Sequence, residues 1–376
     1  MIVDCDVVVI GGGIAGAGVA AELSRDRRVV VLEQEAQPGF HATGRSAALH
    51  SETYGNASIR ALTRASREFF LSGVDGQPFA TPRGCVHIAV RHQLDRLDAF
   101  HAEIGATAGV TRLSGNEART LVPVLRADSV MAALFERHAY DLDVDAIHRA
   151  FLKRLRDGDG TLHCTSGVTD CAFDEGWTVR AGEQAFRAPV LVNAAGAWGD
   201  VVADIAKVKP IGLEPKRRSA MIVDAPAGAD PSRWPAVFDI EEQYYFKPDA
   251  GRILMSPADE TPVLPHDAYS DDLDLAIAVE RIQQVADIPV DRIAYSWAGL
   301  RTFVPDRTPV VGFDPEVPSF FWLVGQGGYG IQTSPALSRL AAALIRNEPM
   351  PHDLVESGVR LEDLSPSRLR TAAARP

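Results

Sequence analysis

The fold of this chain is decided by residues 6–33, DVVVIGGGIAGAGVAAELSRDRRVVVLE. Residues 6–10 form an apolar, β-branched run of the kind that is buried in a parallel sheet. Residues 17–23 predict a helix with small side chains on the face that packs against this strand. A second β-branched run at 28–32 predicts the neighbouring strand, so the whole stretch is typical of one βαβ unit.

Three glycines join the first strand to the helix at the G-x-G-x-x-G spacing. Gly11 allows a tight turn, Gly13 lets the backbone approach a pyrophosphate, and Gly16 lets the helix pack closely on the strand. The helix N-terminus offers N–H groups and a positive dipole end. Glu33 ends the second strand, where it is placed to accept hydrogen bonds from a ribose. These features predict a dinucleotide-binding unit; the alternative is an ordinary βαβ unit whose glycines only make a turn.

The overall composition is that of a folded enzyme. The chain has 376 residues, enough for two domains, and 46% of them are hydrophobic and 23% charged. Its formal net charge of −12 argues against nucleic acid or an anionic membrane surface as a partner. No apolar run reaches membrane-spanning length, and the first strand begins too early to leave room for a signal peptide. We therefore expect a cytoplasmic protein with no integral membrane segment.

The four cysteines give no sign of a metal site or a disulfide framework. They are Cys5, Cys85, Cys164 and Cys171, with no C-x-x-C pair and no histidines at metal-ligand spacing. We expect reduced, unlinked thiols and no metal ion.

Apolar periodicity predicts the remaining elements. Helices are expected at residues 59–70, 94–104, 143–155, 272–286 and 335–345, and another opens at Ser114 as its cap, with Glu117 three residues on. Strands are expected at 84–90, 176–180, 185–188, 190–193, 219–223, 244–247, 252–255 and 320–324. Residues 41–48 predict a loop and helix start that face a ligand. The stretch 218–255 is typical of an antiparallel sheet, and the tail after Leu364 is expected to fray.

Three separate segments are rich in glycine and alanine, at residues 11–16, 193–199 and 325–330. A ligand that needs contacts from both ends of the chain fits FAD better than NAD. The last segment leads into a helix, whose positive end can face a flavin ring and support negative charge on the reduced ring. The alternative for this segment is a glycine-rich hairpin.

Six segments resemble, in order, the family of FAD-dependent D-amino-acid oxidases and dehydrogenases, with glycine and sarcosine oxidases as cousins. They are VIGGGIAG at 9–16, TGRSAA at 43–48, VNAAGAW at 192–198, PKRRSA at 215–220, WAGLR at 297–301 and QGGYGIQTS at 326–334. The resemblance covers almost the whole chain, and the bacterial D-arginine dehydrogenases are the members most like it.

The resemblance implies an α/β FAD-binding domain of the Rossmann type, as in glutathione reductase, plus an α+β substrate domain with an antiparallel sheet. Because the nucleotide-binding segments are scattered, we expect the FAD domain to be discontinuous, with residues 1–82, 138–200 and 296–376. Residues 83–137 and 201–295 are expected to form the substrate domain over the flavin.

The resemblance also implies that FAD is bound without a covalent bond, since no Cys or His lies between residues 320 and 335. The residues that it implies at the cofactor are Gly11, Gly13, Ile14, Ala15, Gly16, Glu33, Gln34, Thr43, Gly44, Arg45, Ser46, Ala47, Ala48, Val168, Ala194, Ala195, Gly196, Trp198, Arg301, Gly327, Gly328, Tyr329, Gly330, Ile331 and Gln332.

Members of the family transfer a hydride from the substrate Cα to flavin N5, with the substrate amine neutral, which is mainly a problem of positioning. The resemblance implies that Arg301 binds the substrate carboxylate, because its planar fork suits a bidentate contact. It implies that Tyr245 donates to the same carboxylate and that Arg218 is a second guanidinium in the pocket. The alternatives are a structural ion pair for Arg301 and a solvated surface position for Arg218.

Three further positions match the family's substrate site: Tyr54, Gly330 and Gln332. Tyr54 lies in a polar loop that ends in Gly55, and it resembles a mobile loop that closes over substrate. Gly330 and Gln332 match positions beside substrate and flavin.

Two positions depart from the members that take D-arginine. Those members carry an acidic residue after a Pro-Arg pair, where this chain has Gly84 and Cys85 after Pro82 and Arg83. Leu49 stands where they carry a histidine, and His50 is one place later; whether His50 substitutes for it is left open. Glu52 is another acid that could meet a cationic substrate end.

The function predicted is oxidative deamination of D-amino acids, with neutral or apolar side chains, to 2-oxo acids and ammonia via an imine. The alternatives are oxidation of a secondary amine such as sarcosine, of glycine, or of a 2-hydroxy acid, and a flavin-carrying subunit without its own catalysis. The expected partner is the small D-amino acid, and oxygen and a quinone both stay open as electron acceptor.

Overall fold

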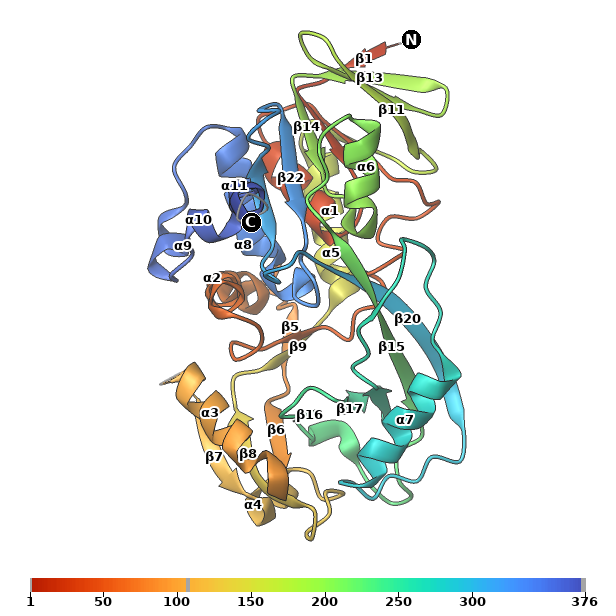
Figure 1. Cartoon of the computed structure of the whole chain (residues 1–376), viewed down its shortest axis with the longest axis vertical. Helices are drawn as coiled ribbons and strands as arrows, with labels where there is room; N and C mark the ends of the chain where they lie inside the picture. Colours follow the sequence, from red (N-terminus) through yellow and green to blue (C-terminus); the bar gives the residue numbers. More distant parts are fainter. Residues whose placement is uncertain (1, 106–108, 373–376) are drawn as a thin grey trace.

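The computed structural model describes residues 2–105 and 109–372. Figure 1 shows a sheet covered by helices in the upper half and a larger sheet in the lower half. The long strands β15 (Glu214–Val223) and β20 (Ile293–Phe303) run from one half into the other. The predicted combination of a Rossmann-type α/β domain and a second domain with a mainly antiparallel sheet is confirmed.

The upper half is built on a six-stranded sheet of three chain segments. Its order is β10 (Gly160–His163), β3 (Val29–Leu32), β2 (Val7–Ile10), β14 (Val190–Asn193), β22 (Phe320–Val324) and β21 (Val310–Phe313). The first five strands are parallel, and β21 is antiparallel to β22. Strands β2, β3 and β22 are buried along their whole length, which explains why they read as unbroken apolar runs.

Both faces of this sheet are covered. On one face lie α1 (Ile14–Leu23), α5 (Val144–Asp157) and α8 (Gly330–Ile345), with α2 (Ala57–Ser72) against α8. The other face packs against α6 (Gly199–Ile205) and a small sheet. The strands of that small sheet are β1 (Ile2–Asp4), β13 (Gln184–Ala188), β12 (Trp177–Ala181) and β11 (Val168–Phe173).

The lower half is one nine-stranded sheet. Its order is β19 (Thr261–Pro262), β15, β18 (Arg252–Ser256), β17 (Tyr245–Asp249), β16 (Ala236–Asp239), β6 (Cys85–Val90), β8 (Val130–Glu136) and β7 (Val110–Ser114), and β20 pairs with β15. Neighbouring strands are antiparallel except β6 and β16, whose pairing is parallel. That contact joins residues 85–88 to residues 236–239, far apart in the sequence.

Alternation along the strands gives this sheet two different faces. Val86 and Ile88 of β6 point into an apolar core under α7 (Asp272–Gln283) and α4 (Gly115–Leu121). Cys85 and His87 of the same strand point to the opposite face, where they line a cavity. α3 (Leu94–Ile104) packs against β6 and β8. One face of the sheet therefore packs against α7 and α4, while the other is partly covered by α3 and lines a cavity at Cys85 and His87.

The remaining elements are a small sheet and several short helices. A three-stranded sheet of β4 (Leu49–His50), β9 (Tyr140–Leu142) and β5 (Ala80–Pro82) lies between the two halves. The others are η1 (Arg91–Gln93), η2 (Gly196–Trp198), η3 (Pro231–Arg233), α9 (His352–Glu356), α10 (Leu361–Leu364) and α11 (Ser367–Ala372). The proposed domain boundary between residues 295 and 296 falls inside β20.

Three local predictions need correction. α8 begins at Gly330 and not at Pro335. Pro335 has no N–H to donate to the Ile331 carbonyl, and the Ser334 hydroxyl donates to that carbonyl instead (2.9 Å). Residues 41–48 form turns without a helix start. The tail does not fray directly after Leu364, since Arg370 forms an ion pair with the buried Asp314; residues 373–376 lie outside the described chain.

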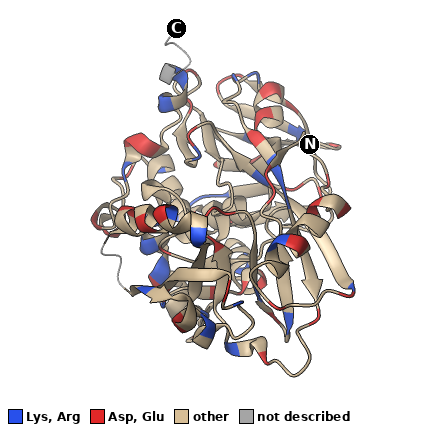
Figure 2. Cartoon of the chain, turned by 60° about the horizontal axis from the view of Figure 1, so that its bottom comes forward, with Lys and Arg blue, Asp and Glu red and all other residues tan. Residues whose placement is uncertain are grey.

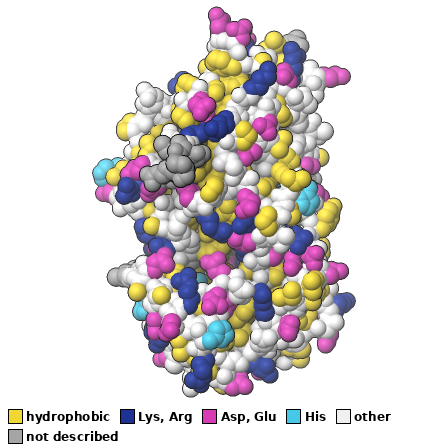
Figure 3. All heavy atoms as spheres, in the orientation of Figure 1, with side chains coloured by type: hydrophobic (Ala, Val, Ile, Leu, Met, Phe, Trp, Pro, Cys, Tyr) yellow, Lys and Arg dark blue, Asp and Glu magenta, His cyan; other side chains and the backbone are white. Residues whose placement is uncertain are grey.

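The charges are spread over the molecule. Figure 2 shows acidic and basic residues interspersed along the elements, and Figure 3 shows both kinds of side chain scattered over one face of the molecule. All four cysteines are free thiols, as predicted. Within residues 2–105 and 109–372, no helix has both the length and the apolar character that crossing a membrane requires.

Candidate functional site

The glycine-rich turn between β2 and α1 is packed too tightly for side chains. Gly11 has φ +106°, and a Cβ there would lie 2.5 Å from the Ala194 carbonyl oxygen. A Cβ on Gly16 would overlap the Gly11 carbonyl oxygen. At Gly13 a Cβ would meet only the Thr43 hydroxyl, and this residue lines an open cleft. The turn therefore has the close helix–strand packing and the exposed backbone that a pyrophosphate requires.

Side chains from distant segments hold this turn in place. The Glu33 carboxylate accepts hydrogen bonds from the N–H groups of Gly12 (2.8 Å) and Glu35 (2.9 Å). The Thr43 hydroxyl accepts from Ile14 N (3.0 Å). His148, which the sequence did not suggest, lies with Nε2 2.9 Å from the Gly12 carbonyl oxygen, and burial lowers the pKa of its imidazole. The turn is thus preformed.

A long cleft runs from the end of β3, past the glycine-rich turn, to the junction of the two halves. Most residues predicted at the cofactor line it: Gly11, Gly13, Ile14, Ala15, Glu33, Gln34, Thr43, Arg45, Ser46, Ala47, Val168, Ala194, Ala195, Gly196, Trp198, Arg301, Gly327, Gly328, Gly330 and Ile331. Ala48 and Gln332 line the adjoining cavity, and Gly16, Gly44 and Tyr329 line neither. The cleft is thus made by the scattered segments that an extended dinucleotide would need.

Some lining residues were not predicted. His41 lines the cleft beside Trp198, with their rings 4.5 Å apart, and its Nε2 is 2.9 Å from Glu35. Ser166, Gly167 and Ala220 also line it. His41 belongs to the stretch 41–48 and Ala220 to the segment 215–220, but the sequence singled out neither residue, and long-range packing brings all four to the cleft.

A second cavity adjoins the cleft where the halves meet. The two share Ser46, Ala47, Arg218, Tyr245, Arg301, Gly328 and Ile331. The second cavity is otherwise lined by residues of the nine-stranded sheet and of the loop before α2, among them Tyr54, Cys85, His87, Phe238, Glu242 and Lys247. The predicted substrate-site residues Arg301, Tyr245, Arg218, Tyr54 and Gln332 all line it, and Gly330 lines the cleft.

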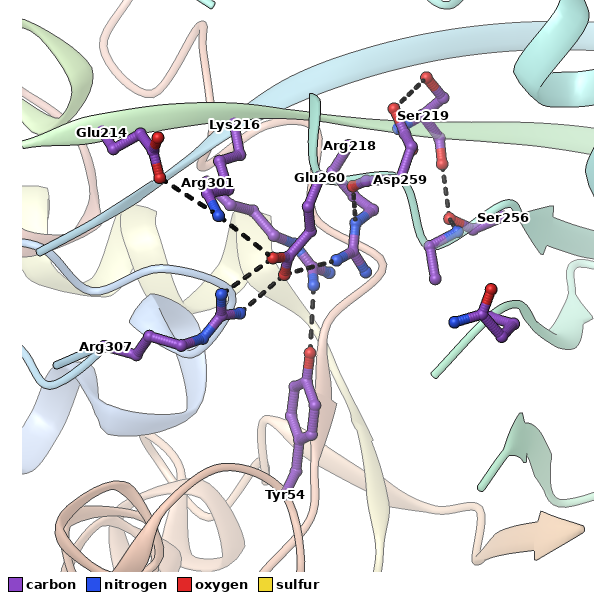
Figure 4. A network of polar contacts seen from close by, with 12 residues as sticks. Tyr54, Glu214, Lys216, Arg218, Ser219, Ser256, Asp259, Glu260, Arg301 and Arg307 are labelled. Atoms are coloured by element: carbon purple, nitrogen blue, oxygen red, sulfur yellow. Dashed lines mark hydrogen bonds and ion pairs between the residues drawn. The ribbon is translucent and has the colours of Figure 1, made fainter. Parts of the chain in front are cut away.

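Arg301 and Arg218 lie on neighbouring strands but have different partners (Figure 4). Arg218 is 9% exposed, donates to Asp259 O (2.8 Å) and pairs with Glu260 (3.2 Å), which Arg307 also binds. Arg301 donates to the Tyr54 hydroxyl (3.1 Å), and no Asp or Glu of the described residues forms an ion pair with it. Burial and the nearby Arg301 lower the pKa of Arg218. The cavity therefore has one guanidinium without a counter-charge.

Small and aromatic residues surround this guanidinium. A Cβ on Gly328 would lie 2.7 Å from Arg301 Nη1, so the glycine makes room for the side chain. The Tyr54 ring packs edge-on against Tyr329, with centroids 4.8 Å apart, and Phe238 stacks on Tyr245 at 5.1 Å. Arg301 is half-buried among these residues, and partial removal from water strengthens any charge-assisted hydrogen bond that it makes.

The structure shows where the two positions lie that differ from the family members that take D-arginine. Leu49 lines the second cavity, whereas His50 is buried on the other side, with Nε2 3.2 Å from Thr63 O and burial lowering its pKa to about 4. His50 is therefore absent from the cavity lining. Cys85 lines the cavity, and Arg83 does not, because it binds Asp141 (2.6 Å).

Two other charged residues, Glu52 and Lys247, lie near the second cavity or in its wall. Glu52 does not line the cavity and lies 3.6 Å from Arg67. Lys247, which the sequence did not suggest, does line it and pairs with Asp141 (2.6 Å). The cavity thus gains a lysine that shares the Asp141 carboxylate with Arg83.

Cys85, His87 and Glu136 form the cluster most similar to a metal site, with one ligand atom of each within 4.8 Å of the others. Both Glu136 oxygens already accept hydrogen bonds, from Ser51, Thr53 and Glu52 N. Burial lowers the pKa of His87 to about 4, so its imidazole is neutral at pH 7. Each Glu136 oxygen is thus already engaged by hydrogen bonds to the loop at 51–53.

Comparisons with known proteins agree with this geometry. The family described as "FAD dependent oxidoreductase" (DAO) matches residues 6–344. Glycine oxidase of Geobacillus kaustophilus is 24% identical, over 93% of this chain and 95% of its own. L-proline dehydrogenase from P. horikoshii superposes with a TM-score of 0.81 at 20% identity, covering 99% of each chain. Iminodiacetate oxidase from Chelativorans sp. gives 0.77 at 21%, covering 96% and 98%.

FAD is the cofactor of this family, and the cleft fits it. We expect the purified protein to be yellow and to release intact FAD on acid denaturation, because the C-terminal segment beside the cleft holds no Cys or His. Absorbance of the supernatant after acid precipitation checks this. Flavin that stays on the denatured chain would contradict non-covalent binding and would direct attention to His41, His87 and Cys85.

The preformed glycine-rich turn, the three-segment cleft and the match over residues 6–344 lead to one assignment. The chain belongs to the DAO family of FAD-dependent oxidoreductases.

Proposed function

We propose that this enzyme oxidatively deaminates D-amino acids with neutral side chains. The observation that supports it most is Arg301, a cavity-lining guanidinium that has no carboxylate partner in the described part of the chain. A charge that is partly removed from water and left unpaired is costly, so such a position is typical of a site whose ligand supplies the counter-charge. An amino-acid carboxylate supplies it.

The side chains of the cavity have separate roles in this proposal. Bound FAD supplies the hydride acceptor. Arg301 and the Tyr54 hydroxyl bind the substrate carboxylate, with Tyr245 as a further phenol in the same wall. Two fixed contacts at one end of the substrate orient its Cα toward the cleft, which is the positioning that hydride transfer needs. Arg218 is held by Glu260 and keeps the same wall positive.

The charges at the cavity favour a neutral substrate side chain. Glu242 is the acidic residue among those that line the cavity, and it lies on an exposed turn, while Arg218, Lys247 and Arg301 also line it. Cys85 stands where a counter-charge for a cationic side chain was expected. A cation placed there would lose water without gaining a buried partner, at a cost of several kcal/mol.

We therefore expect kcat/KM to be higher for D-Met and D-Leu than for D-Arg and D-Lys, by at least about tenfold, the equivalent of 1.4 kcal/mol. Steady-state rates with D-Met, D-Leu, D-Arg, D-Lys and D-Glu measure this. The matched control is Glu242→Gln, which should leave the rate with D-Met unchanged. A tenfold preference for D-Arg that Glu242→Gln removes would contradict the proposal and assign Glu242 to a cationic substrate.

A second candidate is oxidation of glycine or a secondary amine. The similarity to a glycine oxidase and to structures titled L-proline dehydrogenase and iminodiacetate oxidase favours it. All of these substrates carry a carboxylate, so they would use Arg301 in the same way. Turnover of sarcosine, glycine or proline that exceeds turnover of every D-amino acid would establish it.

The electron acceptor and the cellular location are separate questions. Rates measured with oxygen and with an artificial quinone acceptor, at equal substrate, distinguish an oxidase from a dehydrogenase. A cytoplasmic location is kept as a prediction, and fractionation of the source cells tests it.

A further inference from the structure

The loop that carries Tyr54 is fastened to one buried carboxylate. Glu136, at the end of β8, is 2% exposed. Its oxygens accept hydrogen bonds from Ser51 Oγ (2.6 Å), Thr53 Oγ1 (2.8 Å) and the backbone N–H of Glu52 (2.7 Å). Three consecutive residues before Tyr54 are thus bound to a strand of the nine-stranded sheet.

The residues bound by Glu136 are next in the chain to a residue of the proposed carboxylate site. Tyr54 is the next residue of the loop, and its hydroxyl accepts a hydrogen bond from Arg301 (3.1 Å). On the other side of the loop, Ser51 N donates to Gln332 Oε1 (3.2 Å). Glu136 itself lines neither the cleft nor the second cavity. It therefore touches no ligand, yet it fixes the backbone from which Tyr54 reaches Arg301.

The chemistry of the cluster fits an anchor better than a metal ion. A carboxylate that accepts hydrogen bonds at both oxygens, two from hydroxyls and one from a backbone N–H, is satisfied in a buried site. Thr53 Oγ1 also lies 3.3 Å from His87 Nε2, so the threonine joins the anchor to the cavity wall. A metal ion would have to displace these bonds and leave the loop without its acceptor.

We propose that Glu136 is a positioning residue that holds the 51–53 backbone so that Tyr54 and Arg301 bind the substrate carboxylate together. This inference rests on the proposed function, because it takes Arg301 as the carboxylate site. A movement of the loop would leave the buried Glu136 oxygens without their donors, which is costly, so the anchor fixes the phenol relative to the guanidinium before substrate arrives. Removing it leaves the loop free to withdraw Tyr54.

The test uses the FAD-loaded protein and compares Glu136→Ala with Glu136→Gln, which keeps one acceptor oxygen. We expect Glu136→Ala to raise KM for the preferred amino acid by about 10- to 100-fold, roughly the worth of one of the three hydrogen bonds to the carboxylate that hold the loop. Glu136→Gln should recover part of this loss. Bound FAD, measured by the flavin spectrum, should be unchanged in both variants.

A double-mutant comparison with Tyr54 distinguishes a role of Glu136 in positioning Tyr54 from a general role in stability. In a Tyr54→Phe background, the effect of Glu136→Ala on KM should shrink to less than about threefold, since the hydroxyl that Glu136 positions is gone. Independent, additive effects would overturn the proposal. Asp314→Asn is the control, because Asp314 is also a buried carboxylate but is remote from the cavity and binds Trp322 and Arg370; it should leave KM unchanged.

If Glu136→Ala does not fold, the double variant Ser51→Ala and Thr53→Val removes the two hydroxyl donors and takes its place. A KM rise in this variant that Tyr54→Phe cancels supports the anchor, and a normal KM overturns it. Stoichiometric zinc in the purified protein, lost in Cys85→Ser, would also overturn it in favour of a metal site. Normal binding of the amino acid by Arg301→Met would contradict the proposed function itself. If Arg301→Met and Tyr54→Phe impair binding but the Glu136 variants do not, the proposed function stands and only the anchor role of Glu136 is wrong.

Discussion

Replacing Arg301 by methionine is expected to lower kcat/KM for amino acids by roughly 30- to 4000-fold. The loss of a charge-assisted, bidentate pair in a desolvated site costs about 2–5 kcal/mol, and each 1.4 kcal/mol is a factor of ten. Methionine fills a similar volume, and the guanidinium has no carboxylate partner in the described residues that would be left behind. We therefore expect the variant to fold and to keep its FAD spectrum.

Steady-state kinetics of Arg301→Met, with FAD content measured on the same sample, tests this prediction. Arg339→Met is the control, because Arg339 pairs with Asp353 on the surface of α8, away from both cavities. Its kinetics should be those of the parent protein. Near-normal turnover in Arg301→Met would contradict the assignment and move the carboxylate contact to Arg218, the other guanidinium of the cavity.

Gly16→Val is expected to yield protein that contains no FAD. Even a Cβ at this position would overlap the Gly11 carbonyl oxygen, and that oxygen belongs to backbone that cannot rotate away. Overpacking of this kind costs about 1–3 kcal/mol for a small side chain, and a β-branched residue adds to it. The turn must then move off the position at which it meets the pyrophosphate.

The measurement is the ratio of flavin to protein absorbance after purification in the presence of FAD. Gly251→Ala is the control: Gly251 has a positive φ (+81°), unlike Gly16, and a Cβ there meets nothing within 4 Å. That variant should lose some stability and keep its FAD. A fully loaded Gly16→Val protein would show that the turn does not hold the cofactor.

The nucleotide-binding half could be predicted because its signals are local. The strand at 7–10, the three glycines and Glu33 lie within 28 residues, and each has a backbone reason to be where it is. Arg301 was different: its role was implied by the resemblance of residues 297–301 to the family, and it stays a prediction. The structure adds that the Glu33 carboxylate already binds the glycine-rich turn through Gly12.

The second half could be predicted only in part, since it depends on long-range pairing. The parallel contact of β6 with β16 joins residues about 150 apart, and no local pattern specifies it. Lys247 and Glu136 enter the site through that sheet, so neither was found from the sequence. His50 shows that nearness in the sequence can mislead. It follows Leu49 directly, but side chains alternate along a strand, so Leu49 lines the cavity and His50 points away from it.

Reduction of the bound flavin without oxygen tests the central claim most directly. The protein is mixed anaerobically with D-Met, L-Met, sarcosine, L-proline or D-lactate, and the flavin absorbance is followed in the parent protein and in Arg301→Met. The account predicts rapid bleaching by D-Met, none by L-Met, and slow or no bleaching by D-Met in Arg301→Met. Bleaching by D-lactate or L-proline but not by any D-amino acid, or equal bleaching of the two proteins by D-Met, would contradict it.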